Sequence, residues 1–196
     1  SLHDALPILM GIEVEKPIIN EVSFKNNFTN EGGIEGTTRF LKNITGMWIL
    51  ERCREQWKLS GLDYSYDDMV RMAELSEFTS LINPDDPRFA NPESMVREIT
   101  AYCKETGQAV PASDADYIHC IFYSLANRYK EVLEILKSMS PHPIERLHVI
   151  GGGSRNDLLN QLTANAIGIP VLAGPSEATA IGNCLIQAKS AGLLAD

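Results

Sequence analysis

Apolar residues change their spacing along the first quarter of the chain. Residues 18–28 alternate in polarity, which predicts one or two strands with an exposed face and a turn at Asn26-Asn27. From about 37 to 57, apolar residues recur every three or four positions and predict a helix. Gly46 would lie inside that helix at a cost of about 1 kcal/mol relative to alanine, which indicates close approach of a ligand or of a neighbouring helix.

Capping signals predict the helices that follow. Ser65 and Asp68 form a capping box that opens a helix near 65–76. Asn91 is the expected N-cap of the next helix, which Gly107 ends.

The longest predicted helix opens with Ser113 and Asp116 and carries one apolar stripe. The stripe consists of Ile118, Phe122, Leu125, Tyr129, Val132 and Leu136. It covers under three heptads, too few to indicate a coiled coil, so we interpret it as the buried face of a core helix.

The last quarter of the chain alternates short apolar runs with helical patterns. We expect strands at 147–150 and 169–172, each followed by a helix, at 154–167 and at about 177–190. Two strands separated by one helix form a βαβ unit, which predicts a parallel pair and an α/β fold.

Three glycines, Gly151, Gly152 and Gly153, join the first of these strands to its helix, which we expect to open at Ser154. Backbone without side chains, next to a helix N-terminus, suits a nucleotide, although glycines also close ordinary turns. The segment has no P-loop lysine, and Asn156 occupies the position of the third glycine in Gly-x-Gly-x-x-Gly. A nucleotide here would therefore be held by its adenosine end.

Composition and charge exclude several classes of protein. The net charge of −9 argues against a protein that binds nucleic-acid backbones. No apolar run approaches the ~18 residues of a membrane span, and the first residues do not resemble a signal peptide, so we expect a cytoplasmic protein. The four cysteines, without a Cys-x-x-Cys pair, are expected to be reduced, and Cys103 would meet Cys120 if their helices pack together.

Groups that could perform catalysis are scarce. The aspartates at predicted helix starts are explained by capping, and Ser124 has no nearby base. Asp85 and Asp86 lie in a proline-bounded loop and are either turn residues or magnesium ligands. His148 is expected to be a hydrogen-bonded core residue. We therefore assign no catalytic residue and no metal ligand to this chain.

Several of these segments resemble the FGGY carbohydrate kinases. Residues 151–162 resemble the family's adenosine motif, and residues 174–183 resemble the closing helix that follows it. Two further pairs of segments make the resemblance specific to family members that act on L-rhamnulose. The first pair is 29–33 and 41–44, and the second pair is 82–89 and 91–93. The similarity runs from about residue 9 to residue 193.

The resemblance implies an actin-like ATPase (ribonuclease-H-like) α/β fold, a mixed sheet flanked by helices, with residues 9–196 as the C-terminal ATP-binding domain. It implies transfer of the γ-phosphoryl group of ATP, with Mg²⁺, to the 1-hydroxyl of L-rhamnulose in rhamnose catabolism. In the family an N-terminal domain carries the catalytic aspartate, so the chain is expected to need that domain and to be inactive alone. A kinase for another ketose or polyol, and a stand-alone nucleotide-binding or scaffolding module, remain alternatives.

The same resemblance assigns roles to individual residues. Asn43 matches a sugar-contacting position and Gly152 a nucleotide-contacting one; Gly151, Gly153 and Asn156 belong to the same adenosine wall. Glu51 stands where a nucleotide-contacting glutamine is expected, and its charge would lie near the phosphates.

Residues 1–8 depart from the family pattern. Leu6 stands where a phosphate-binding threonine is expected, and Pro7 removes a backbone donor. We interpret this segment as foreign to the family, as a truncation or a misread gene would produce.

Overall fold

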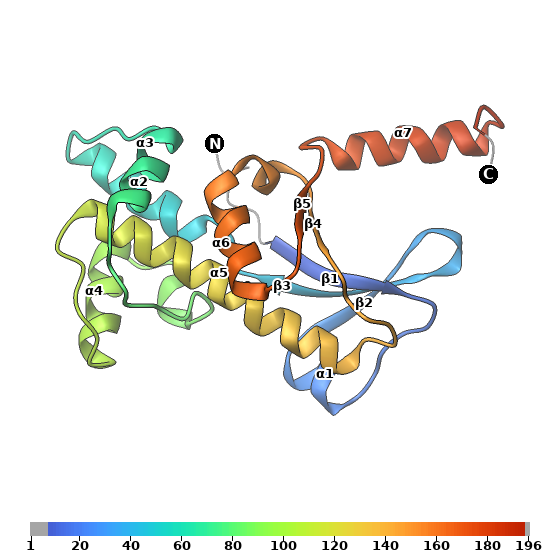
Figure 1. Ribbon diagram of the computed structural model, residues 1–196, viewed down its shortest axis with the longest axis horizontal. Helices are drawn as coiled ribbons and strands as arrows, with labels where there is room; N and C mark the ends of the chain where they lie inside the picture. The colour runs from blue at the N-terminus through green and yellow to red at the C-terminus, as the bar shows by residue number, and fades with distance from the viewer. Residues whose placement is uncertain (1–7, 195–196) are drawn as a thin grey trace. The chain divides into compact units, whose positions relative to one another are not determined.

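The computed structural model describes residues 8–194, which are drawn in colour in Figure 1. The chain divides into two compact units, Ser1–Pro143 and Ile144–Asp196, and each is described by itself. The departures expected at Leu6 and Pro7 lie outside the described residues.

The first unit combines an antiparallel sheet with a layer of helices. Its elements are β1 (Ile8–Val14), α1 (Glu21–Lys25), β2 (Phe28–Gly32), β3 (Thr38–Ile44), α2 (Trp48–Leu59), α3 (Tyr66–Leu75), α4 (Met95–Glu105) and α5 (Asp114–Met139). The second unit contains β4 (Leu147–Val149), α6 (Asp157–Ile167), β5 (Val171–Ala173) and α7 (Ala178–Ser190).

Strand β3 lies in the centre of the three-stranded sheet, between β1 and β2. The helix predicted from 37 to 57 is therefore wrong in its first half, where alternate side chains of β3 are buried. Phe40 and Ile44 are four residues apart, a spacing that fits both a helix and one face of a strand. Hydrogen bonding to β1 on one edge and to β2 on the other stabilises the strand conformation of these residues. Gly46 lies in the connection to α2, outside any helix.

The strands predicted at 18–28 are also largely wrong, because residues 21–25 form helix α1. Asn20 and Ser23 form a reciprocal capping box, which gives these residues the local hydrogen bonds of a helix start. The turn is confirmed: Asn27 has a positive φ of 54° immediately before β2.

Helix α5 forms the core of the helical layer. The apolar stripe predicted for it is confirmed, since all six of its residues are buried. The capping boxes predicted at its start and at the start of α3 are both present, and α3 packs against α5 (Figure 1). The start of α4 was misplaced: Ser94 caps it by accepting from the Arg97 amide, whereas Asn91 precedes the cap.

In the second unit β4 and β5 pair in parallel, as predicted, with Leu147 opposite Val171. Helix α6 begins later than expected, because the Asn156 side chain accepts from the Leu159 amide and is the N-cap. Ser154 instead lies buried in a short 3₁₀ turn. His148 is exposed, which corrects its prediction as a core histidine, since a two-stranded sheet leaves this face of β4 uncovered.

The described cysteines carry free thiols, and all but Cys184 are buried. Cys103 and Cys120 meet as predicted, since each thiol is the main cause of the shifted pKa of the other: the pKa of Cys103 is lowered and that of Cys120 is raised. Within residues 8–194, no helix has the length and apolar character needed to cross a bilayer.

Candidate nucleotide and sugar site

The three-glycine turn is open to solvent on one side. Gly151 has a φ of +77°, a conformation that favours glycine, and its carbonyl oxygen accepts from the Ser154 amide at 3.1 Å. A Cβ on Gly152 would meet no atom within 4 Å, and one on Gly153 would only touch Val149 at 3.8 Å. This turn therefore leaves backbone that a planar ligand can approach.

The two segments that resemble the family's adenosine region lie side by side. The Gly151 amide donates to the Pro175 carbonyl oxygen at 3.2 Å, and Gly174 donates to Val149 at 2.8 Å. The Arg155 guanidinium donates to the Ser176 hydroxyl at 2.9 Å. Residues 151–156 and 174–177 thus form one continuous surface of the second unit.

Asn156 contributes its side-chain oxygen to the helix cap rather than to open solvent. Its Oδ1 accepts from the Leu159 amide at 2.9 Å, while its backbone amide donates to the Gly153 carbonyl at 3.2 Å. The residue is half-buried. Asn156 therefore holds the glycine turn to the start of α6, and its Nδ2 group is the part that a ligand could contact.

Asn43, the expected sugar contact, lies on the exposed face of β3 in the first unit. In the register it stands opposite Leu9 of β1, which is 51% exposed. Within residues 8–194 the side-chain amide of Asn43 has no hydrogen-bond partner. Both of its donors and its acceptor are thus available to hydroxyl groups.

Glu51 lies on α2, with its side chain 18% exposed. Its carboxylate accepts from the Tyr66 hydroxyl and lies 3.7 Å from Arg54. The Arg54 guanidinium in turn lies over the Tyr66 ring, 4.9 Å from its centroid. The expected negative charge at this position is therefore partly balanced by a neighbouring cation.

Asp85, one of the two carboxylates considered for magnesium, belongs to an ion-pair network. Its Oδ2 accepts from Arg128 Nε at 2.8 Å, and its Oδ1 accepts from the Thr45 hydroxyl at 2.9 Å. Asp86 caps the short helix that follows and pairs with Arg88. Turn and ion-pair chemistry thus explain both residues.

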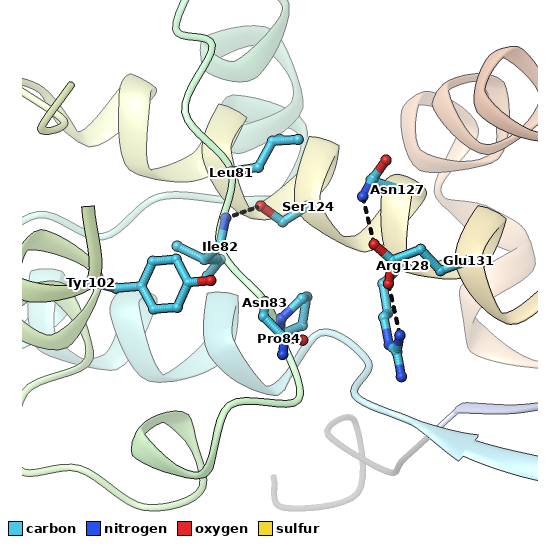
Figure 2. A pocket seen from close by; sticks show the side chains of 9 residues that line it. All are labelled: Leu81, Ile82, Asn83, Pro84, Tyr102, Ser124, Asn127, Arg128 and Glu131. Carbon is cyan, nitrogen blue, oxygen red and sulfur yellow. Dashed lines mark hydrogen bonds and ion pairs between the residues drawn. The ribbon is translucent and has the colours of Figure 1, made fainter. Parts of the chain in front are cut away.

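A cavity of about 170 Å³ lies beside this network, between residues 81–84 and helix α5 (Figure 2). Arg128 and Glu131 line it and are hydrogen-bonded to each other at 2.7 Å, so their charges largely cancel. Tyr102 of α4 closes another side.

The described part of the chain contains no group of three or more His, Cys, Asp or Glu side chains that could hold a metal ion. With Asp85 paired to Arg128, these residues do not fit a protein-held Mg²⁺ site.

Comparison with known proteins identifies the family. The model of the FGGY family of carbohydrate kinases, C-terminal domain, matches residues 8–191. The chain belongs to this family. It is 60% identical over 189 residues to a rhamnulokinase of Bacteroides thetaiotaomicron, and 45% identical over 180 residues to a rhamnulokinase of Bacillus subtilis.

These alignments cover 96% and 91% of this chain but only 38% and 36% of the two relatives. The chain thus spans a little over a third of the length of the curated relatives it matches, in their C-terminal portion.

The xylulose kinase of Bifidobacterium adolescentis is similar in structure, with a TM-score of 0.51 at 16% identity. That alignment covers 83% of this chain and 31% of the xylulose kinase chain. It shows the fold and confirms the predicted α/β, actin-like ATPase class.

Residue patterns alone missed one group around the site, the Thr45–Asp85–Arg128 network. Its members are far apart in sequence and come together only when β3, the loop at 82–89 and α5 pack. The one sequence feature that pointed toward this network was the segment 82–89, because its two prolines and its paired aspartates predicted an ordered loop.

Proposed function

We propose that this chain forms the ATP- and sugar-binding part of a kinase that phosphorylates the 1-hydroxyl of L-rhamnulose. The observation that carries the proposal is the 60% identity to a rhamnulokinase over almost the whole chain. The exposed glycine turn and the unpartnered Asn43 amide support it, because they are free surfaces of the kind that a nucleoside and a polyol require.

Each surface has a defined role in this proposal. The backbone of Gly151, Gly152 and Gly153 contacts the adenosine, and Asn156 keeps that backbone in place at the start of α6. Asn43 hydrogen-bonds sugar hydroxyls. Glu51 accepts from a ribose hydroxyl or the adenine amine, and Arg54 reduces the repulsion that its charge would exert on the phosphates.

An N-terminal domain of the same family would supply the base that deprotonates the sugar hydroxyl and the turn that binds the phosphates. ATP would act as its Mg²⁺ complex, with the ion bound largely by the phosphates and by water. Phosphoryl transfer depends on positioning and charge neutralisation, so we expect turnover to require both domains.

The test joins residues 9–196 to the N-terminal portion of the Bacteroides relative, including the relative's own segment in place of residues 1–8, and measures ATP-dependent phosphorylation of L-rhamnulose. We expect turnover in the usual kinase range of ~1–100 s⁻¹, and none from the chain alone. Asn43→Ala should raise the KM for the sugar with little effect on that for ATP. Turnover with another ketose or a polyol, but not with L-rhamnulose, would reassign the sugar.

The nucleotide surface has its own test in Gly152→Val. Because the site of the added side chain is open, this change leaves folding intact and obstructs only a ligand. In calorimetry of the joined enzyme, we expect Gly152→Val to bind ATP at least tenfold more weakly than the unchanged sequence. The control is Gln161→Ala, on the exposed face of α6, which should bind ATP with unchanged affinity. Unchanged affinity for ATP in Gly152→Val would contradict the assignment of the turn.

A further inference from the structure

The loop at 82–89 is held at both ends by the helices around it. The Ile82 amide donates to the Ser124 hydroxyl of α5 at 2.9 Å (Figure 2), and Trp48 of α2 donates through Nε1 to the Phe89 carbonyl at 3.2 Å. Arg88 is bonded to Glu105 of α4 at 2.8 Å. Three helices therefore fix the position of this loop.

Asp85 projects from the loop to the end of β3. Its carboxylate accepts from the Thr45 backbone amide at 3.3 Å and from the Thr45 hydroxyl at 2.9 Å. On its other side Arg128 Nε donates to it at 2.8 Å. The side chains of Asp85 and Arg128 are only 28% and 18% exposed, so water screens this pair weakly.

The end of β3 needs such a restraint because its pairing is one-sided there. Pairing with β2 reaches Lys42, opposite Phe28, and goes no further. Asn43 and Ile44 pair only with β1, through Leu9 and Ile8. Thr45 is the next residue, so its bonds to Asp85 act where the strand has lost one of its neighbours.

We propose that Asp85 is a positioning residue for Asn43. Asp85, which is paired with Arg128, holds Thr45 in place through hydrogen bonds. Thr45 in turn fixes the end of β3, from which Asn43 contacts the sugar. This inference rests on the proposed sugar-binding role of Asn43. It assigns the segment 82–89 a role in sugar binding without contact to the sugar.

The charges around the network favour an ionised Asp85. Burial by itself would raise the pKa of this carboxyl, but the hydrogen bonds from Thr45 and the positive charge of Arg128 outweigh it and hold the pKa below its ordinary value. Burial, followed by the charge of Arg128, lowers the pKa of nearby Lys42, while Asp85 opposes that shift. An acceptor that stays ionised binds the Thr45 donors more strongly than a neutral one.

The first experiment measures the strand end directly, in the full 196-residue chain, by NMR and amide hydrogen exchange. Thr45→Val removes the hydroxyl donor without changing side-chain shape. We expect faster exchange of the residue 45 amide and a lower order parameter for the Asn43 side chain, with both restored in Thr45→Ser. An unchanged Asn43 order parameter in Thr45→Val would overturn the proposal.

The second experiment measures sugar use in the enzyme joined to the N-terminal portion of the Bacteroides relative. Thr45→Val and Asp85→Asn should raise the KM for L-rhamnulose roughly 3- to 10-fold, the equivalent of one lost hydrogen bond, with the KM for ATP unchanged. Thr106→Val, which removes a hydroxyl from the end of α4, is the matched control and should leave the sugar KM unchanged.

The outcomes separate this inference from the proposed function. If Asn43→Ala raises the KM for L-rhamnulose and Thr45→Val does not, the positioning role is wrong and the kinase assignment stands. If Asn43→Ala has no effect, the sugar contact itself is wrong. A general loss of stability would lower the melting temperature and the apparent turnover while leaving both KM values unchanged, which would also contradict a specific positioning role.

Discussion

At Gly11, the hydrogen in place of a side chain allows β1 to approach β3. A Cβ at this position would overlap the Phe40 carbonyl oxygen and would lie 2.9 Å from the Leu41 Cα. Both groups belong to the central strand, which is paired on its other edge with β2 and cannot easily move. The packing of two backbones, rather than a turn, therefore requires glycine here.

Gly11→Ala should accordingly destabilise the first unit by about 1–3 kcal/mol, the usual cost of overpacking. Both tryptophans, Trp48 and Trp57, lie in this unit, so tryptophan fluorescence during urea unfolding reports on it. The matched control is Gly32→Ala on β2, where a Cβ would meet nothing within 4 Å. Equal unfolding midpoints for the two variants would contradict the close approach at Gly11.

Among the elements, α5 shows how local and tertiary signals combine. Its 26 residues begin at a capping box between Ser113 and Asp116, in which each side chain accepts from the other residue's backbone amide. Because α5 contributes more buried side chains than any other described helix, loss of its first turn would also loosen the residues packed against it.

Ser113→Ala should lower the free energy of unfolding of the first unit by about 0.5–2 kcal/mol, the range for a lost N-cap. Ser113→Asp should retain most of the stability, because a carboxylate is also a good N-cap. Circular dichroism and urea unfolding would measure both variants. If alanine and aspartate proved equally stable, the cap would not contribute.

At the scale of the whole molecule, the carboxylates give stability a defined dependence on pH. Burial raises the pKa of Asp85 and of Asp116, but hydrogen bonds to Thr45 and to Ser76, respectively, outweigh it, and both pKa values lie below the ordinary 3.8. A carboxyl with a lowered folded-state pKa stabilises the fold above its unfolded-state pKa. That contribution is lost as the pH falls through the folded-state value.

We therefore expect the stability advantage of the chain over Asp85→Asn to be constant from pH 7 to about pH 5 and to shrink below pH 3.8. Urea unfolding followed by tryptophan fluorescence at a series of pH values measures this difference. An advantage that persisted undiminished at pH 2 would show that the charge of Asp85 is not what stabilises the fold.

The two units differ in how completely their apolar surface is covered. Helix α7 has no buried residue, and Figure 1 shows it extending away from the β4–β5 pair of its own unit. A two-stranded sheet with short strands is only marginally stable in water. We expect this unit to exchange its amides faster than the first one.

Sequence patterns that act within a few residues were enough to predict several helices, strands and turns of this protein. Capping boxes at Ser65 and Ser113 were placed correctly, because a side-chain acceptor three residues from its donor needs no tertiary partner. The stripe on α5, the parallel pair β4–β5 and the glycine turn followed from periodicity and from the conformational freedom of glycine. Shared motifs in the right order predicted the family.

Only the tertiary structure decided the rest. Thr38–Ile44 carries apolar spacing that suits a helix or a strand, and the flanking strands β1 and β2 select the strand. From its sequence neighbours Asp85 is either a turn residue or a magnesium ligand, and the packing of α5 brings Arg128 to it as an ion-pair partner. The physical reason is common to both: the deciding partner is distant in the chain, and its contribution exists only once the chain has folded.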